Sequence, residues 1–227
     1  MSRIWLRARH SAVSLWRDRN GIAATEFAVI VPLMLVMFFG TIEFSSGLAV
    51  DRKVTLIART LSDLTAQSSS DPTSQSSAQT LTDIIIQNVF TASISIAYPY
   101  PPSPTTAKVS QVYVDSNNKA TIQWSNAAII ASDTATQATL TGAPYTPGKD
   151  VTSQVPPTLL IKNTFLIWSE VSYLYKPAVG YLMAQSGVTL SDFAYSRPRQ
   201  FTCLFYQTFI PPFTNPTANP ATKCPMP

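Results

Sequence analysis

Residues 21–50 read GIAATEFAVIVPLMLVMFFGTIEFSSGLAV, and this stretch decides the expected fold. It contains no Lys, Arg or Asp, and Glu26 and Glu43 are its only charged residues. A helix of about 20 apolar residues is long enough to cross a bilayer. No second stretch of the sequence has this length and composition. The sequence therefore predicts a single transmembrane span at residues 22–49.

The charges outside this stretch are distributed unevenly. The 227 residues carry 16 Lys and Arg against 12 Asp and Glu, a net charge of +4. Residues 1–20 alone hold five Arg and one Asp, which is also +4. Basic residues before a span and balanced charge after it predict a cytoplasmic N-terminus and an extracytoplasmic body. The basic balance is thus an orientation signal and gives no support to a nucleic-acid partner.

Other interpretations of the span stay open at this point. It can serve as a plain signal anchor, or as a secretory signal that is cut after Ala49. Against that cut, the apolar run from Phe27 to Ile42 is longer than the usual signal core and contains Pro32. Because proline lacks an N–H, Pro32 also predicts a bend in the helix.

Glu26 is the most informative residue of the span, since an unpaired carboxylate inside a membrane costs a few kcal/mol. Gly21-Ile22 followed by Glu26-Phe27 resembles the processing site of type IV prepilins, especially of the Flp type, in which a membrane peptidase cuts after the glycine. The resemblance implies cleavage before Ile22, with Glu26 pairing with the new amino terminus of a neighbouring subunit. The alternative is that Glu26 lies in the lipid headgroup region.

The resemblance extends along the apolar run. Residues 21–43 resemble the N-terminal signature of TadE-like proteins of the Tad pilus system, and a looser likeness covers 170–177 and 195–199. The matching positions of the signature are Gly21, Ala24, Glu26, Phe27, Ala28, Pro32, Gly40 and Glu43. At about 1.5 Å per residue, Glu26 and Glu43 would bracket the apolar core at its two interfaces.

This resemblance carries expectations about function. It implies a pilin-like fold and a non-catalytic minor pseudopilin, or assembly factor, of the TadE or TadF type. The larger TadG type needs an Asp-x-Ser-x-Ser metal site that the sequence does not contain. The implied partners are the inner membrane, other Tad pilus subunits or assembly proteins, and the prepilin peptidase if the chain is processed. The implied location is the inner membrane, with the C-terminal domain in the periplasm or outside the cell.

The helix is expected to continue beyond the membrane. Apolar residues recur at helical spacing at Val50, Val54, Ile57, Leu61 and Leu64, with charges between them. This stripe predicts a helix to about residue 66 that packs on its own domain, with a coiled coil as the alternative.

The body is predicted to be α+β, with this long helix packed on a small antiparallel sheet. A helix is expected at 80–90 with Thr80 as its N-cap, and a β-hairpin at 108–124. The remaining expected elements are a surface excursion at 127–155, a central strand at 163–176, a short helix at 177–185 and a strand at 188–197.

Cys203 and Cys224 bracket a Pro-rich tail, and two cysteines in an exported domain most often form a disulfide. Two unpaired thiols are the alternative. Catalysis is disfavoured, because the single histidine, His10, lies in the basic arm and the sequence has no metal-ligand cluster, phosphate loop or nucleophile motif. We therefore expect no catalytic residue, no metal and no cofactor.

Two further function classes remain besides the pseudopilin: a membrane-anchored periplasmic binding module outside any filament, and an anchored periplasmic enzyme. In all three, the expected organisation has six parts: a basic cytoplasmic leader (1–21), a transmembrane helix (22–49), its extracytoplasmic extension (50–67), a linker (68–79), an α+β domain (80–200) and a Pro-rich tail (201–227).

Overall fold

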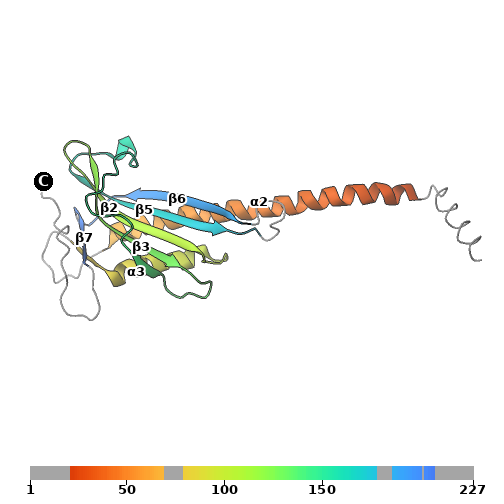
Figure 1. The fold of residues 1–227 in the computed structure, drawn as a ribbon, viewed down its shortest axis with the longest axis horizontal. Coiled ribbons are helices and arrows are strands. Elements are labelled where there is room, and N and C mark those ends of the chain that lie inside the picture. Colours follow the sequence, from red (N-terminus) through yellow and green to blue (C-terminus); the bar gives the residue numbers. More distant parts are fainter. Residues whose placement is uncertain (1–20, 69–78, 178–185, 201, 208–227) are drawn as a thin grey trace, which may run out of the picture. The chain divides into compact units, whose positions relative to one another are not determined.

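The computed structural model describes residues 21–68, 79–177, 186–200 and 202–207 (Figure 1). The chain divides into two units, residues 1–46 and 47–227, and each is described by itself. The basic arm, most of the expected linker, the short helix expected at 177–185 and the end of the Pro-rich tail fall outside the described residues.

One long helix, α2 (Ile22–Gln67), contains both the apolar run and the amphipathic stripe. The prediction of a helix that continues past the apolar run is confirmed. Pro32 lies inside α2 and does not end it. The hydroxyls of Thr25 and Thr41 donate to carbonyls of the preceding turn, Ile22 O and Met37 O, at 2.8 Å each.

The second unit is built on a five-stranded sheet in which every neighbouring pair is antiparallel (Figure 1). This confirms the predicted α+β fold. The strand order is β4 (Thr139–Gly142), β3 (Ala120–Ile130), β2 (Thr105–Val114), β5 (Thr164–Tyr175) and β6 (Val188–Ser196).

The predicted hairpin is formed by β2 and β3. Asn118 has the positive φ of 62° that its turn requires. The Asp115 carboxylate accepts hydrogen bonds from the backbone N–H groups of Asn117 and Lys119, both at 2.8 Å. The turn residues thus fix the register of the two strands.

The outer part of α2, residues 47–67, packs against the sheet through the predicted stripe. Val50, Val54, Ile57 and Leu61 are at most 3% exposed, while Leu64 lies at the edge of the contact with 37% exposed. The Ser169 hydroxyl of β5 donates to the carbonyl oxygen of Ala58 at 2.6 Å. The stripe is therefore an internal face of its own domain, as predicted.

A β-bulge at Gln123 changes the face of the sheet to which the following side chains of β3 point. Val112 of β2 pairs with Ile122, whereas the preceding residue Gln111 pairs with Trp124, so Gln123 is an extra residue. As a result Ile122 packs in the outer cluster with Val112, while Trp124 packs on the helix side. Without the bulge both side chains would share one face.

A second, two-stranded parallel sheet was not expected. It pairs β1 (Gln79–Thr82) with β7 (Leu204–Gln207). Long-range side-chain bonds hold β7: Gln111 Oε1 accepts from Leu204 N at 2.8 Å, and Trp124 Nε1 donates to Leu204 O at 2.9 Å.

This sheet also corrects the predicted start of the following helix. Helix α3 (Asp83–Ala97) begins after Thr82, whose hydroxyl accepts from Ile85 N at 3.4 Å. The predicted N-cap, Thr80, is wrong because Thr80 belongs to β1, where it pairs with Phe205. The helix also extends seven residues past the predicted end at residue 90.

The interpretation of residues 127–155 as a surface excursion is also wrong in part. This stretch includes the end of β3 and all of β4. Val151 and Val155 are buried in the outer cluster, followed by a short 3₁₀ helix (Pro157–Leu159). The alternation of apolar and polar residues that marks a strand is weak there, because many of the strand residues are Ala and Thr.

The stripe on α2 makes a direct prediction about stability. Leu61 is fully buried, so Leu61→Ala removes packed methyl groups and should lower the free energy of unfolding by about 2–5 kcal/mol. The matched variant Leu56→Ala alters a side chain on the same helix that is 48% exposed. It should change the free energy of unfolding by less than about 0.5 kcal/mol. Urea unfolding of the full chain in detergent measures both. Equal losses would show that the stripe is not the packed face.

Candidate functional site

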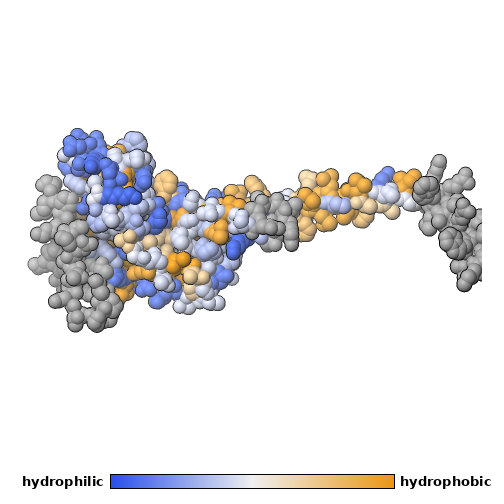
Figure 2. All heavy atoms as spheres, in the orientation of Figure 1, coloured by the Kyte–Doolittle hydropathy of each residue, from blue (hydrophilic) through white to orange (hydrophobic). Residues whose placement is uncertain are grey.

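The first unit presents an unusually apolar surface. Within the most apolar 18-residue window of α2, none of the residues is buried (Figure 2). Its exposed side chains include Phe27, Val29, Leu33, Met34, Met37 and Phe38, each at least 60% exposed. Soluble monomers rarely expose contiguous apolar patches of more than a few hundred Å². Among the described residues, α2 alone is long and apolar enough to cross a membrane, which is consistent with a membrane anchor or a signal sequence.

The predicted processing residues lie at the start of this helix. Ile22 is the first residue of α2 and is 55% exposed. A Cβ atom added to Gly21 would meet no atom within 4 Å. Glu26 and Phe27 follow about one turn later and are exposed. The structure thus places these four residues together on an accessible helix start, and cleavage itself stays a prediction.

The two glutamates of the apolar run differ in exposure. Glu26 is exposed, whereas Glu43 is 2% exposed. Gly40, one turn before Glu43, is half-buried, and a Cβ there would meet nothing within 4 Å. The sequence predicts an interfacial position for both glutamates. The position of each relative to a membrane stays a prediction.

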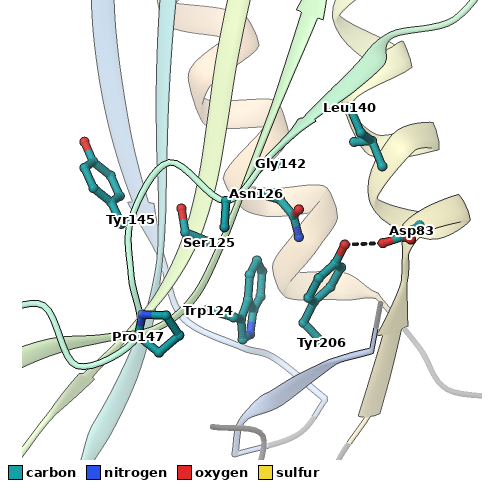
Figure 3. Close-up of a pocket in the computed structure, with 10 residues that line it drawn as sticks. Asp83, Trp124, Ser125, Asn126, Leu140, Gly142, Tyr145, Pro147 and Tyr206 are labelled. Atoms are coloured by element: carbon teal, nitrogen blue, oxygen red, sulfur yellow. Dashed lines mark hydrogen bonds between the residues drawn. The ribbon is translucent and has the colours of Figure 1, made fainter. Parts of the chain in front are cut away.

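The second unit contains a cavity of about 230 Å³ beside β3 that sequence reasoning missed (Figure 3). Figure 3 shows the Asn126 carboxamide extending toward Tyr206, with Tyr145 and Pro147 on the other side of β3. The Tyr206 hydroxyl donates to the Asp83 carboxylate. The lining residues are Asp83, Trp124, Ser125, Asn126, Leu140, Gly142, Ala143, Tyr145, Pro147 and Tyr206.

An aromatic and ionic cluster lies next to this cavity. Tyr145 and Trp168 are stacked at 5.6 Å between ring centroids, and Trp168 stacks on Tyr195 at 6.0 Å. The Tyr145 hydroxyl donates to Glu170 Oε2 at 2.8 Å, and Lys108 Nζ lies 3.7 Å from Glu170 Oε1. The ring stack and the ion pair hold Tyr145 in place at the rim of the cavity.

Burial and a neighbouring carboxylate change the acidity of these phenols. Burial first, and the hydrogen bond to Glu170 second, raise the pKa of Tyr145 to about 12. Burial, with a smaller contribution from the Glu170 charge, also raises the pKa of Tyr195 to about 12. Both phenols are therefore neutral hydrogen-bond donors throughout the physiological range.

Across the described ranges, no group of three or more His, Cys, Asp or Glu side chains comes together in a way that could hold a metal. Two buried polar atoms, Asn126 Nδ2 and Trp168 Nε1, have no hydrogen-bond partner within the described part of the chain. No pattern in the sequence predicts that these atoms are buried without a partner, because their surroundings depend on the register of the strands.

The fold is therefore α+β and pilin-like, with a long apolar N-terminal helix and a five-stranded antiparallel sheet. Residues 21–61 match the family described as TadE-like protein, so this part of the chain is a TadE-like domain. The match begins at the predicted processing glycine and ends at the buried Leu61, before the sheet. The chain matches no curated protein and no solved structure in the same comparisons.

The raised phenol pKa values predict a loss of stability in alkali. Because folding favours the neutral phenols, their contribution is fully present below pH 10, the ordinary pKa, and is lost as the pH rises through about 12. Tyr195→Phe should make this loss smaller, since phenylalanine cannot ionise. Tyr98→Phe, which changes a residue that is 77% exposed, is the control. Thermal melts recorded at a series of pH values measure the loss of stability. A loss in Tyr195→Phe as large as in the unmodified protein contradicts this explanation.

Proposed function

We propose that the chain is a membrane-anchored, non-catalytic subunit of a Tad or Flp-type pilus machine, either a minor pseudopilin or an assembly factor. The observation that carries the proposal is the apolar first half of α2, whose large side chains are exposed and which falls inside the TadE-like domain. Such a surface needs lipid or other apolar helices around it. The pilin-like fold of the body supports the same function.

The proposed orientation follows from the charges. Five Arg precede the helix within residues 1–20, and only Glu26 and Glu43 are charged over the next 30 residues. The positive-inside bias then places the N-terminus in the cytoplasm and the sheet domain in the periplasm or outside the cell. In this arrangement the inner membrane holds residues 22–49, and the body is available to other pilus subunits or assembly proteins.

Processing by a prepilin peptidase is part of the proposal. Cleavage between Gly21 and Ile22 would remove the basic arm and leave residues 22–227 with 11 basic and 11 acidic side chains. It would also create an ammonium group on Ile22. Glu26 lies about one turn away, so the Glu26 carboxylate of one copy can compensate this charge on a packed neighbour, which lowers the cost of both charges in the membrane.

The mature N-terminus tests this proposal. Mass spectrometry of the protein from membranes should give a chain that starts at Ile22, and Gly21→Leu should leave the arm attached. Because a Cβ at Gly21 meets nothing within 4 Å, lost cleavage would reflect recognition by the peptidase and not misfolding. Gly40→Leu, equally free of contacts, should be cleaved normally. An intact Met1 in the unmodified protein would contradict processing.

The alternative function, a membrane-anchored periplasmic binding module outside the filament, uses the same anchor. It differs in what contacts the apolar helix. Photo-crosslinkers at Val29, Val36 and Phe39, which are 75%, 51% and 38% exposed, should capture pilin subunits if the chain enters or primes the filament. Capture of lipid alone favours the binding module.

We also propose that Cys203 and Cys224 form a disulfide in the oxidising compartment. Cys203 is 1% exposed and immediately precedes β7, and Cys224 lies outside the described residues. Closing a loop of about 20 residues stabilises a fold by roughly 3 kcal/mol.

The disulfide is tested by alkylation and unfolding. Without reductant, the denatured protein should take up no iodoacetamide at either cysteine. Cys224→Ser should lower the free energy of unfolding by roughly 3 kcal/mol. As a control, unfolding of the unmodified protein under reductant should give the same loss. Alkylation of both thiols without reductant would show that no bridge forms.

A further inference from the structure

The cavity of about 230 Å³ lies at the edge of a strand and not on a face of the sheet. Trp124, Ser125 and Asn126 are consecutive residues of β3, and all three line it. Successive side chains of a strand point to opposite faces. A cavity that contacts three in a row must therefore adjoin the strand's edge, where backbone groups are within reach.

The pairing of β3 explains why its edge is open there. On one side of the cavity, β4 pairs with residues 127–129. On the other side, Ile122 exchanges backbone hydrogen bonds with Gly148 and Lys149 at 2.7 and 2.9 Å. Residues 123–126 lie between these two paired stretches, so a short length of edge faces the cavity. Such an edge binds an extended peptide readily.

Asn126 adds a specific requirement for an acceptor. Its side chain is 4% exposed, and Nδ2 has no hydrogen-bond partner among the described residues. A buried donor left without a partner costs about 1–3 kcal/mol. The terminal torsion of an asparagine side chain is broad, so a small rotation turns Nδ2 into the cavity. A carbonyl oxygen placed there would satisfy it.

The size and charge of the cavity select the kind of occupant. Sites for drug-sized ligands are typically about 300–1,000 Å³, so this smaller cavity suits one apolar side chain and a backbone amide better than an oligosaccharide. Among the described residues that line it, Asp83 alone is charged. Acidic ligands are therefore disfavoured, and an uncharged peptide segment fits.

We propose that this cavity is a peptide-binding site and that residues 208–222 of the same chain occupy it. This segment, TFIPPFTNPTANPAT, has no charged residue. It offers Phe209, Ile210 and Phe213 as side chains of suitable size, and its four prolines favour an extended backbone. A backbone carbonyl of the segment accepts from Asn126 Nδ2, and one large apolar side chain fills the cavity.

The position of the segment in the chain favours this occupant over others. It begins two residues after Tyr206, which forms one wall of the cavity. A short tether gives a segment a millimolar effective concentration, which an unlinked peptide in the periplasm does not reach. Docking would also cover the open edge of β3 in the isolated chain.

Photo-crosslinking in the full-length membrane protein tests the proposal. With p-benzoylphenylalanine in place of Phe213, illumination should link tryptic peptide 200–223 to tryptic peptide 120–149, which carries eight of the ten lining residues. The product should have the mass of one chain. The control places the same photo-crosslinker at Phe193, an exposed residue of β6, and should not link to peptide 120–149.

Two variants separate this site from a chance contact. Asn126→Leu removes the donor that the segment's carbonyl needs, so the crosslink yield should fall about fivefold, while a cooperative thermal melt shows that the domain still folds. Ala143→Trp fills the cavity from an exposed position and should abolish the crosslink, whereas Thr141→Trp, exposed but outside the lining, should not.

Three results would overturn the proposal. The first is the absence of any link to peptide 120–149. The second is a yield that neither Asn126→Leu nor Ala143→Trp changes, which would indicate a cavity filled by water only. The third is a crosslinked species with the mass of two chains, which would show that a neighbouring copy supplies the segment.

Discussion

The packing of one stripe of α2 against the sheet is the interaction on which the rest of the body depends. Val50, Val54, Ile57 and Leu61 form one side of the main core, and Ser169 bonds to the backbone of α2 at Ala58. A helix that binds its own sheet in this way has no need of a coiled-coil partner over the same residues. The apolar half of α2 has no such stripe, and its exposed side chains need a different environment.

The bulge at Gln123 has consequences beyond the hairpin. By moving Trp124 to the helix side, it brings the indole N–H to the backbone of Leu204, and so it anchors β7. It also directs Asn126 to the same face as Trp124, beside α3. The bulge therefore determines the face of the sheet on which Trp124 and Asn126 line the cavity.

Much of the fold was predictable because periodicity is a local signal. The helical spacing from Val50 onward, the Asn-rich turn and the strand-like run that became β5 each carry their pattern within a few residues. The parallel pair of β1 and β7 joins residues more than 120 positions apart, and the bulge depends on pairing across strands. The start of α3 was misplaced for the same reason. The cavity is formed only when the β1–β7 pair, the bulge and the start of α3 come together, so no local sequence pattern predicts it.

Labelling of lysines in intact spheroplasts tests most directly the claim that α2 anchors an extracytoplasmic body. Lys119 and Lys162 are exposed on the second unit. A membrane-impermeant amine reagent should modify both before the cells are lysed, and mass spectrometry identifies the sites. Modification of these lysines only after lysis would place the body in the cytoplasm and contradict the account.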